Sequence, residues 1–97
     1  TAMDFNFTGE VIEWRGPAPF YFIETPAKYV PEIKAIAADK SYGWGVLHAM
    51  VTIKNQTFKT ALFPKQGLYL IPLKNAVRKP LAIELGDKVK VALDFDC

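Results

Sequence analysis

The sequence predicts a mainly β protein: a small six-stranded β-barrel, closed or partly closed, with two short helices. Three observations lead to this prediction. The chain has 97 residues, which suits a single domain. Hydrophobic residues make up 51% of it, too many for a disordered chain. Its apolar residues also recur at every second position in short runs that Pro and Gly interrupt. Closing the sheet removes the exposed edges that an open sheet of this size would leave.

The first two strands are predicted over residues 4–14 and 20–24. In the first, Phe5, Phe7 and Val11 are separated by even numbers of residues, with Gly9 between the last two, which places them on one face. The segment between the two strands contains one glycine and two prolines. Because proline cannot donate to a strand ladder, the first strand ends before this segment.

A helix follows, predicted over residues 30–39. Tyr29, Ile33 and Ile36 recur at helical spacing. Pro31 is compatible with a helix only in its first turn, where a backbone N–H has no intrahelical acceptor. This places the start of the regular helix near residue 30.

The middle of the chain predicts a β-hairpin and a second tight turn. The hairpin consists of strands over residues 46–53 and 57–63, joined by residues 54–56. The second turn covers residues 64–67, with Gly67 suited to a positive φ.

The last third of the chain predicts two more strands around a short helical segment. The strands cover residues 68–71 and 88–95, and the helical turn covers residues 74–79 and ends at Pro80. The final strand alternates most regularly, so one face of it should line the core. Its inward-facing residues are predicted to be Val89, Val91, Leu93 and Phe95.

Charge gives little information about partners. The net charge is +2, with −2 in residues 1–53 and +4 in residues 54–97. This basic bias is well short of the dense Lys and Arg clusters typical of nucleic-acid-binding proteins.

Several features predict a cytoplasmic protein that does not enter membranes. The only cysteine is Cys97, so no intramolecular disulfide forms and nothing indicates an oxidising compartment. No basic segment precedes an apolar run at the start of the chain, so we expect no signal peptide. The longest uncharged stretch, residues 41–53, is shorter than the roughly 18 apolar residues that span a bilayer.

We expect one domain over residues 3–97. Met3 makes a natural initiator, and the two residues before it, Thr1 and Ala2, are expected to be a cloning remnant. Either a monomer or a homodimer is compatible with this organisation.

Four motifs resemble a known bacterial family. They are WRGPAPFYF at residues 14–22, YGWG at 42–45, LFPK at 62–65 and YLIPLK at 69–74. In this order they resemble the family called domain of unknown function 1905. The resemblance implies a small β-barrel with no established activity. It also implies that some relatives carry a second domain of the YdeI/OmpD-associated type after the barrel.

The C-terminal part has a second, weaker resemblance. The sequence LIP at residues 70–72, a short basic helical segment and LGDKV at 85–89 are similar to AbrB-like swapped-hairpin DNA-binding domains. This likeness implies an alternative function, a dimer that binds DNA and whose affinity falls steeply with salt. Its phosphate contacts would come from Lys74, Arg78, Lys79 and Lys88.

The sequence does not predict an enzyme. The only histidine, His48, lies in a predicted strand on the same face as Val46 and Met50. A general base at this position would need partners that the sequence does not supply, so one satisfied hydrogen bond is the simpler interpretation. One histidine and one terminal cysteine are too few for a zinc site, and there is no calcium-binding loop. We therefore expect no metal and no cofactor.

The candidate binding residues are aromatic and basic. They lie in or beside the connections at residues 15–19, 42–45 and 64–67, which could meet at one mouth of the barrel. Aromatic faces combined with cations suit a flat, anionic small ligand or a protein partner. The candidate residues are Arg15, Tyr21, Tyr42, Trp44 and Lys65.

The alternative is that the aromatic residues only fill the core. Trp14, Phe20, Phe22 and Trp44 are large enough to dominate the interior of a domain of this size. In that case Arg15 would pair with backbone carbonyls of its own loop. Whether Arg15, Tyr42, Trp44 and Lys65 line one cavity or point apart decides between the two interpretations.

Overall fold

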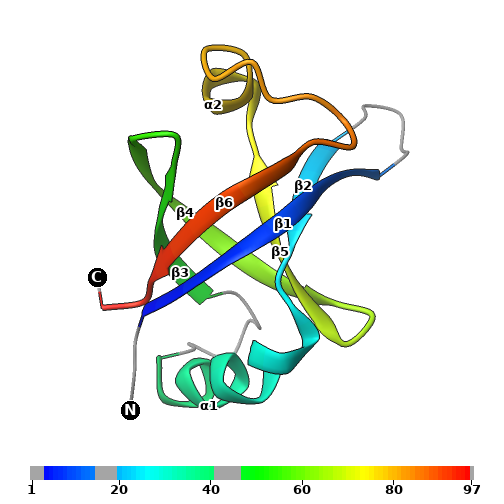
Figure 1. The fold of residues 1–97 in the computed structure, drawn as a ribbon. Coiled ribbons are helices and arrows are strands. Elements are labelled where there is room, and N and C mark those ends of the chain that lie inside the picture. The colour runs from blue at the N-terminus through cyan, green and yellow to red at the C-terminus, as the bar shows by residue number, and fades with distance from the viewer. Residues whose placement is uncertain (1–3, 15–19, 41–46, 97) are drawn as a thin grey trace.

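The computed structural model describes residues 4–14, 20–40 and 47–96 and shows a closed, six-stranded antiparallel β-barrel, which confirms the predicted fold (Figure 1). The strand order around the barrel is β1-β2-β5-β4-β3-β6. The strands are β1 (Asp4–Trp14), β2 (Phe20–Glu24), β3 (Leu47–Ile53), β4 (Gln56–Lys65), β5 (Leu68–Leu73) and β6 (Lys88–Asp94). The helices are the 3-10 turn η1 (Ala27–Tyr29), α1 (Val30–Lys40) and α2 (Asn75–Arg78).

Strand β1 closes the barrel because it has a different partner along each half. From Asp4 to Glu10 it pairs with β6, and from Val11 to Trp14 it pairs with β2. Gly9 lies just before this change of partner, and a Cβ atom there would collide with the side chain of Ile23 on β2. Glycine at this position therefore lets β1 approach β2 closely where the barrel turns.

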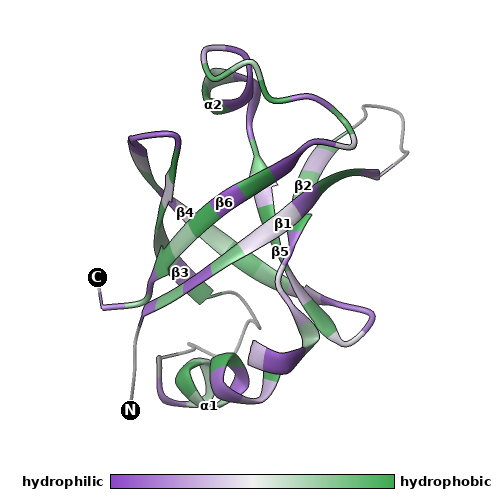
Figure 2. Ribbon diagram, in the orientation of Figure 1, coloured by the Kyte–Doolittle hydropathy of each residue, from purple (hydrophilic) through white to green (hydrophobic). Residues whose placement is uncertain are grey.

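The β3–β4 and β4–β5 connections are two-residue turns, shorter than predicted. Lys54 and Asn55 have φ values of 50° and 69°, and Gln66 and Gly67 have 52° and 81°. Turns with two consecutive positive φ values match the right-handed twist of the paired strands. The strand β4 therefore begins at Gln56 and runs to the residue before Gln66. Hydrophilic residues gather at the tips of both hairpins (Figure 2).

The core lies inside the barrel and beneath α1, which lies across one end while α2 lies at the other (Figure 1). The predicted inward face of the last strand is confirmed, because Val89, Val91 and Leu93 of β6 are buried, and so is Phe95 just after its end. The helical face predicted from the spacing of Ile33 and Ile36 is also buried. Pro31 lies in the first turn of α1, as expected. Within the described residues, no helix is both long enough and apolar enough to cross a bilayer.

Strand β5 continues through Pro72, beyond the end predicted at residue 71. The backbone N–H of Thr25 bonds to the carbonyl of Tyr69, so odd-numbered residues of β5 direct their backbone groups toward β2. The nitrogen of Pro72 therefore faces the β4 side, where the pairing of β5 with β4 already ends at Leu70. The missing N–H of Pro72 interrupts no strand ladder, and β5 continues.

We expect Thr25→Val to lower the free energy of unfolding by about 1–3 kcal/mol. The buried Thr25 hydroxyl donates to the Tyr69 carbonyl at 3.0 Å and accepts from the Tyr69 N–H at 3.2 Å. Valine has nearly the same shape as threonine, but it leaves the buried N–H of Tyr69 without its acceptor. Urea denaturation measures the change, and Thr8→Val on the exposed face of β1 serves as the control, with an expected change within about 0.5 kcal/mol. Equal losses in both variants would show that the Thr25 hydroxyl contributes nothing specific.

Candidate functional site

The candidate site is an apolar surface on the outside of the barrel, where β1, β2, β5 and β4 lie side by side. Val11, Ile23 and Ile71 are paired with one another and belong to the interior core. Because successive strand residues point to opposite faces, their neighbours face outward. We call this surface the aromatic face; it consists of Ile12, Trp14, Phe20, Phe22, Phe63, Leu70 and Pro72.

Phe22 is the centre of the aromatic face. It is only 5% exposed, yet it does not belong to the interior core. Three rings surround it, with centroid distances of 6.1 Å to Trp14, 6.4 Å to Phe20 and 5.4 Å to Phe63. Trp14 is itself 47% exposed and Phe20 59% exposed. The outer rings therefore shield Phe22 while presenting their own surface to solvent.

The alternative interpretation, in which Trp14, Phe20 and Phe22 fill the core, is wrong for Trp14 and Phe20, which are exposed, whereas Phe22 is buried as that interpretation expected but outside the interior cluster. Tyr21 packs against the interior core and Ile23 is part of it. The alternation along β2 then requires Phe20 and Phe22 to face outward. Trp14 pairs directly with Phe20, so it lies on the same side of the sheet.

Lys65 joins the aromatic face from β4. Its Nζ atom lies 2.9 Å from the centroid of the Trp14 ring. A cation over an indole is stabilised by the negative face of the ring, by about 0.5–1 kcal/mol at an exposed site. Lys65 thereby connects the ends of two strands that are not neighbours in the barrel.

Two grooves flank Phe22. The first has a volume of about 250 Å³ and is lined by Trp14, Glu24, Lys65 and neighbouring residues. The second has a volume of about 370 Å³ and is lined by Phe20, Pro72, Lys74 and their neighbours. Phe22 lines both, so the two grooves lie on either side of its ring.

Tyr21 lies on the opposite side of the barrel wall from Lys65. The Tyr21 side chain packs against the core near α2, and the guanidinium carbon of Arg78 lies 4.2 Å from its ring centroid. Arg78 also donates to the Ile83 carbonyl at 3.2 Å and to Asn75 Oδ1 at 3.4 Å. These contacts tie α2 and the following loop to the end of the barrel. The structure therefore does not bring Tyr21 and Lys65 into one site.

The other three predicted binding residues, Arg15, Tyr42 and Trp44, lie outside the described residues. Trp14, Phe20 and Phe63 were not among the predicted binding residues. The available signal was the sequence FYFI at residues 20–23, which is apolar on both faces of a strand. Such a strand indicates that its outer face is also covered or is used for binding.

The residues proposed for DNA contacts lie on two segments, three of them at the ends of α2 and the fourth at the start of β6. Lys74 and Lys79 are exposed on either side of α2. Lys88 is exposed at the start of β6, opposite Glu10 of β1. Arg78 differs from these three because its guanidinium group is held against Tyr21. All six strands of the barrel come from one chain.

His48 is exposed on the outer face of β3, on the same side as Met50, as the alternation predicts. The neighbouring Leu47 and Ala49 point into the core. Across the described parts of the chain, no three His, Cys, Asp or Glu side chains come together in a way that could hold a metal ion.

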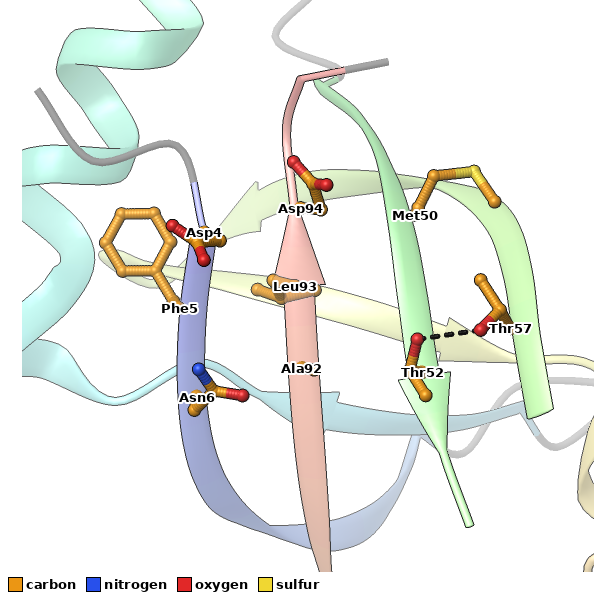
Figure 3. Close-up of a pocket in the computed structure, with 9 residues that line it drawn as sticks. All are labelled: Asp4, Phe5, Asn6, Met50, Thr52, Thr57, Ala92, Leu93 and Asp94. Carbon is orange, nitrogen blue, oxygen red and sulfur yellow. Dashed lines mark hydrogen bonds between the residues drawn. The ribbon is translucent and has the colours of Figure 1, made fainter. Parts of the chain in front are cut away.

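A third groove lies on the other side of the barrel, across β1, β6, β3 and β4 (Figure 3). It has a volume of about 380 Å³, and Asp4 and Asp94, which pair across the two strands, stand at one end of it. The hydroxyls of Thr52 and Thr57 are hydrogen-bonded to each other at 2.8 Å at its other side. Its only aromatic lining residue, Phe5, is buried, so this groove lacks the exposed rings of the aromatic face.

Comparison with known proteins places the chain in a family. No curated protein matches the sequence. A family model described as domain of unknown function (DUF1905) matches residues 7–93, which include all of β2 to β5 and most of β1 and β6. The match agrees with the four motifs and with the barrel that they were expected to form. The chain therefore belongs to the DUF1905 family.

Proposed function

We propose that this barrel is a non-enzymatic binding module that takes up a small ligand or a protein partner on its aromatic face. The observation that carries the proposal is the exposure of Trp14 and Phe20 above the buried ring of Phe22. Large exposed apolar patches on small domains commonly mark interaction sites, because leaving such rings in water is unfavourable.

The expected gain from covering these rings is substantial. An aromatic side chain buries about 150–250 Å², and roughly half of that remains exposed on Trp14 and Phe20. At about 25 cal/mol per Å², covering each ring contributes about 2–3 kcal/mol. The two rings together therefore suit a partner with a flat apolar group that settles into the grooves beside Phe22.

Lys65 restricts the chemistry of such a partner. Its ammonium group already lies over Trp14, so a partner with an anionic group can bind at Lys65 while the cation stays on the ring. Flat aromatic carboxylates satisfy both requirements. They match the type of ligand that the aromatic and basic residues of the sequence predict.

Calorimetric titration with a panel of indole and naphthalene carboxylates tests the proposal. We expect at least one compound to bind the wild type, and both Trp14→Ala and Phe20→Ala to weaken that binding by about 10-fold or more, as the loss of about 1.4 kcal/mol requires. Leu85→Ala is the matched control, because Leu85 is 55% exposed but lies outside the aromatic face. The proposal is overturned if no compound binds, or if the two aromatic variants bind as well as Leu85→Ala does.

A further inference from the structure

The aromatic face carries opposite charges at its two ends. On β2, Glu24 lies two residues after Phe22 and lines the first groove together with Glu13 and Lys65, so this groove carries one net negative charge. Phe20 lies two residues before Phe22 and lines the second groove, which Lys74 borders just after the end of β5. Since Phe22 pairs with Pro72, the acidic end and the basic end lie on opposite sides of the central ring.

Both charged groups are available to a partner. Glu24 and Lys74 are exposed, and among residues 4–14, 20–40 and 47–96 neither side chain takes part in an ion pair or a side-chain hydrogen bond. Along β2, the distance from the position of Glu24 to that of Phe20 is about 13 Å, at roughly 3.3 Å per residue. Lys74 follows Leu73, the partner of Tyr21, so it lies level with Phe20. Glu24 and Lys74 are therefore about 13 Å apart along the strand direction, with Phe22 between them.

We infer that the occupant of the aromatic face is a second copy of this chain, related to the first by a two-fold axis that passes close to Phe22. A two-fold interface places the same surface on both sides, so it must be complementary to itself. The axis lies in the interface and runs across the strands beside Phe22, so a half-turn about it exchanges the acidic and basic ends. Glu24 of one copy then faces the partner's Lys74, and its own Lys74 faces the partner's Glu24. This inference rests on the proposed function and names the partner of that same site.

The same half-turn also matches the grooves. Phe20 of one copy, beside its own second groove, comes to lie over the first groove of its partner. Each copy thus covers the exposed rings of the other. A ligand with a single charge would satisfy only one end of the face, whereas a second copy satisfies both. The surface involves fewer residues than the roughly 20–30 per side of a standard interface, so the dimer should be weak and concentration-dependent.

Charge reversal gives a direct test. Sedimentation velocity over protein concentrations from about 10 µM to about 1 mM spans the range expected of a weak dimer. We expect the wild type to dimerise, and Glu24→Lys and Lys74→Glu each to weaken dimerisation by about 10-fold or more, because each reversal creates two like-charge contacts. Mixing the two variants should restore association as a heterodimer, since both ion pairs are then re-formed, one with its original sign and one with the sign reversed. Glu32→Lys on α1 and Lys59→Glu on β4 are the matched controls, both at exposed positions away from the aromatic face.

The outcomes separate this inference from the proposed function. A wild type that stays monomeric throughout the range overturns the inference. So does a dimer that both control variants weaken equally, or a mixture of the two variants that fails to associate. If the protein is monomeric but an aromatic carboxylate binds in a manner that depends on Trp14, the proposed function holds and only the identity of the partner is wrong. If neither association nor ligand binding occurs, both are wrong.

Discussion

Truncation of Leu93 to alanine is expected to lower the free energy of unfolding by about 2–5 kcal/mol. Leu93 is 1% exposed and belongs to the interior core. It pairs with Phe5 of β1 on one side and with Val51 of β3 on the other. The cavity would thus open where β6 joins both of its neighbours. For a domain whose total stability is about 5–10 kcal/mol, this change removes a large fraction of it.

Urea denaturation of the two variants Leu93→Ala and Lys90→Ala measures the effect. Lys90 lies on the same strand but on its exposed face, so its truncation should change stability by no more than about 0.5 kcal/mol. A larger loss for Lys90→Ala, or the same loss for both variants, would mean that the inner and outer faces of β6 are exchanged.

The second large effect is expected for Gly9→Ala. The added Cβ would collide with the side chain of Ile23, which is fully buried, and would lie 3.4 Å from the carbonyl oxygen of Glu24. Neither group can move without shifting β2. Overpacking of this kind costs about 1–3 kcal/mol, and the loss should appear as a lower denaturation midpoint.

Two control variants show that the cost comes from packing. Gly67→Ala has open space around the new Cβ but a φ of 81°, so its cost is conformational and about 1–2 kcal/mol. The decisive comparison is the double variant Gly9→Ala with Ile23→Ala, which removes the atom that collides. We expect the double variant to be more stable than the sum of the single effects predicts. Strict additivity would rule out the Gly9–Ile23 contact as the cause.

The sequence predicted those strands in which only one face is apolar. In β6, polar residues alternate with Val89, Val91 and Leu93, so the period of two identifies both the strand and its inner face. The turn containing Gly67 was predicted for a similar reason, because few residues other than glycine tolerate its φ. Its exact length was not predictable, since it depends on how far the paired strands remain hydrogen-bonded.

The aromatic face could not be predicted in the same way. In residues 20–23 every position is apolar, so alternation does not reveal which rings face outward. The contact between Lys65 and Trp14 joins two strands far apart in the chain, and it depends on the strand order and the curvature of the sheet. Residue types indicated that aromatic and basic side chains carry the binding chemistry, but only the fold shows which of them lie together.

The pairing of β1 with β6 has a consequence for biosynthesis. Asp4 finds its partner in Asp94, so one edge of the first strand stays open until β6 has been translated. At about 5–20 residues per second, the 73 residues between these strands take about 4–15 s to synthesise. The β3–β4 and β4–β5 hairpins, whose partners are close in sequence, can form within that interval. During it, the nascent chain exposes an unpaired strand edge that other nascent chains or a ribosome-associated chaperone can bind.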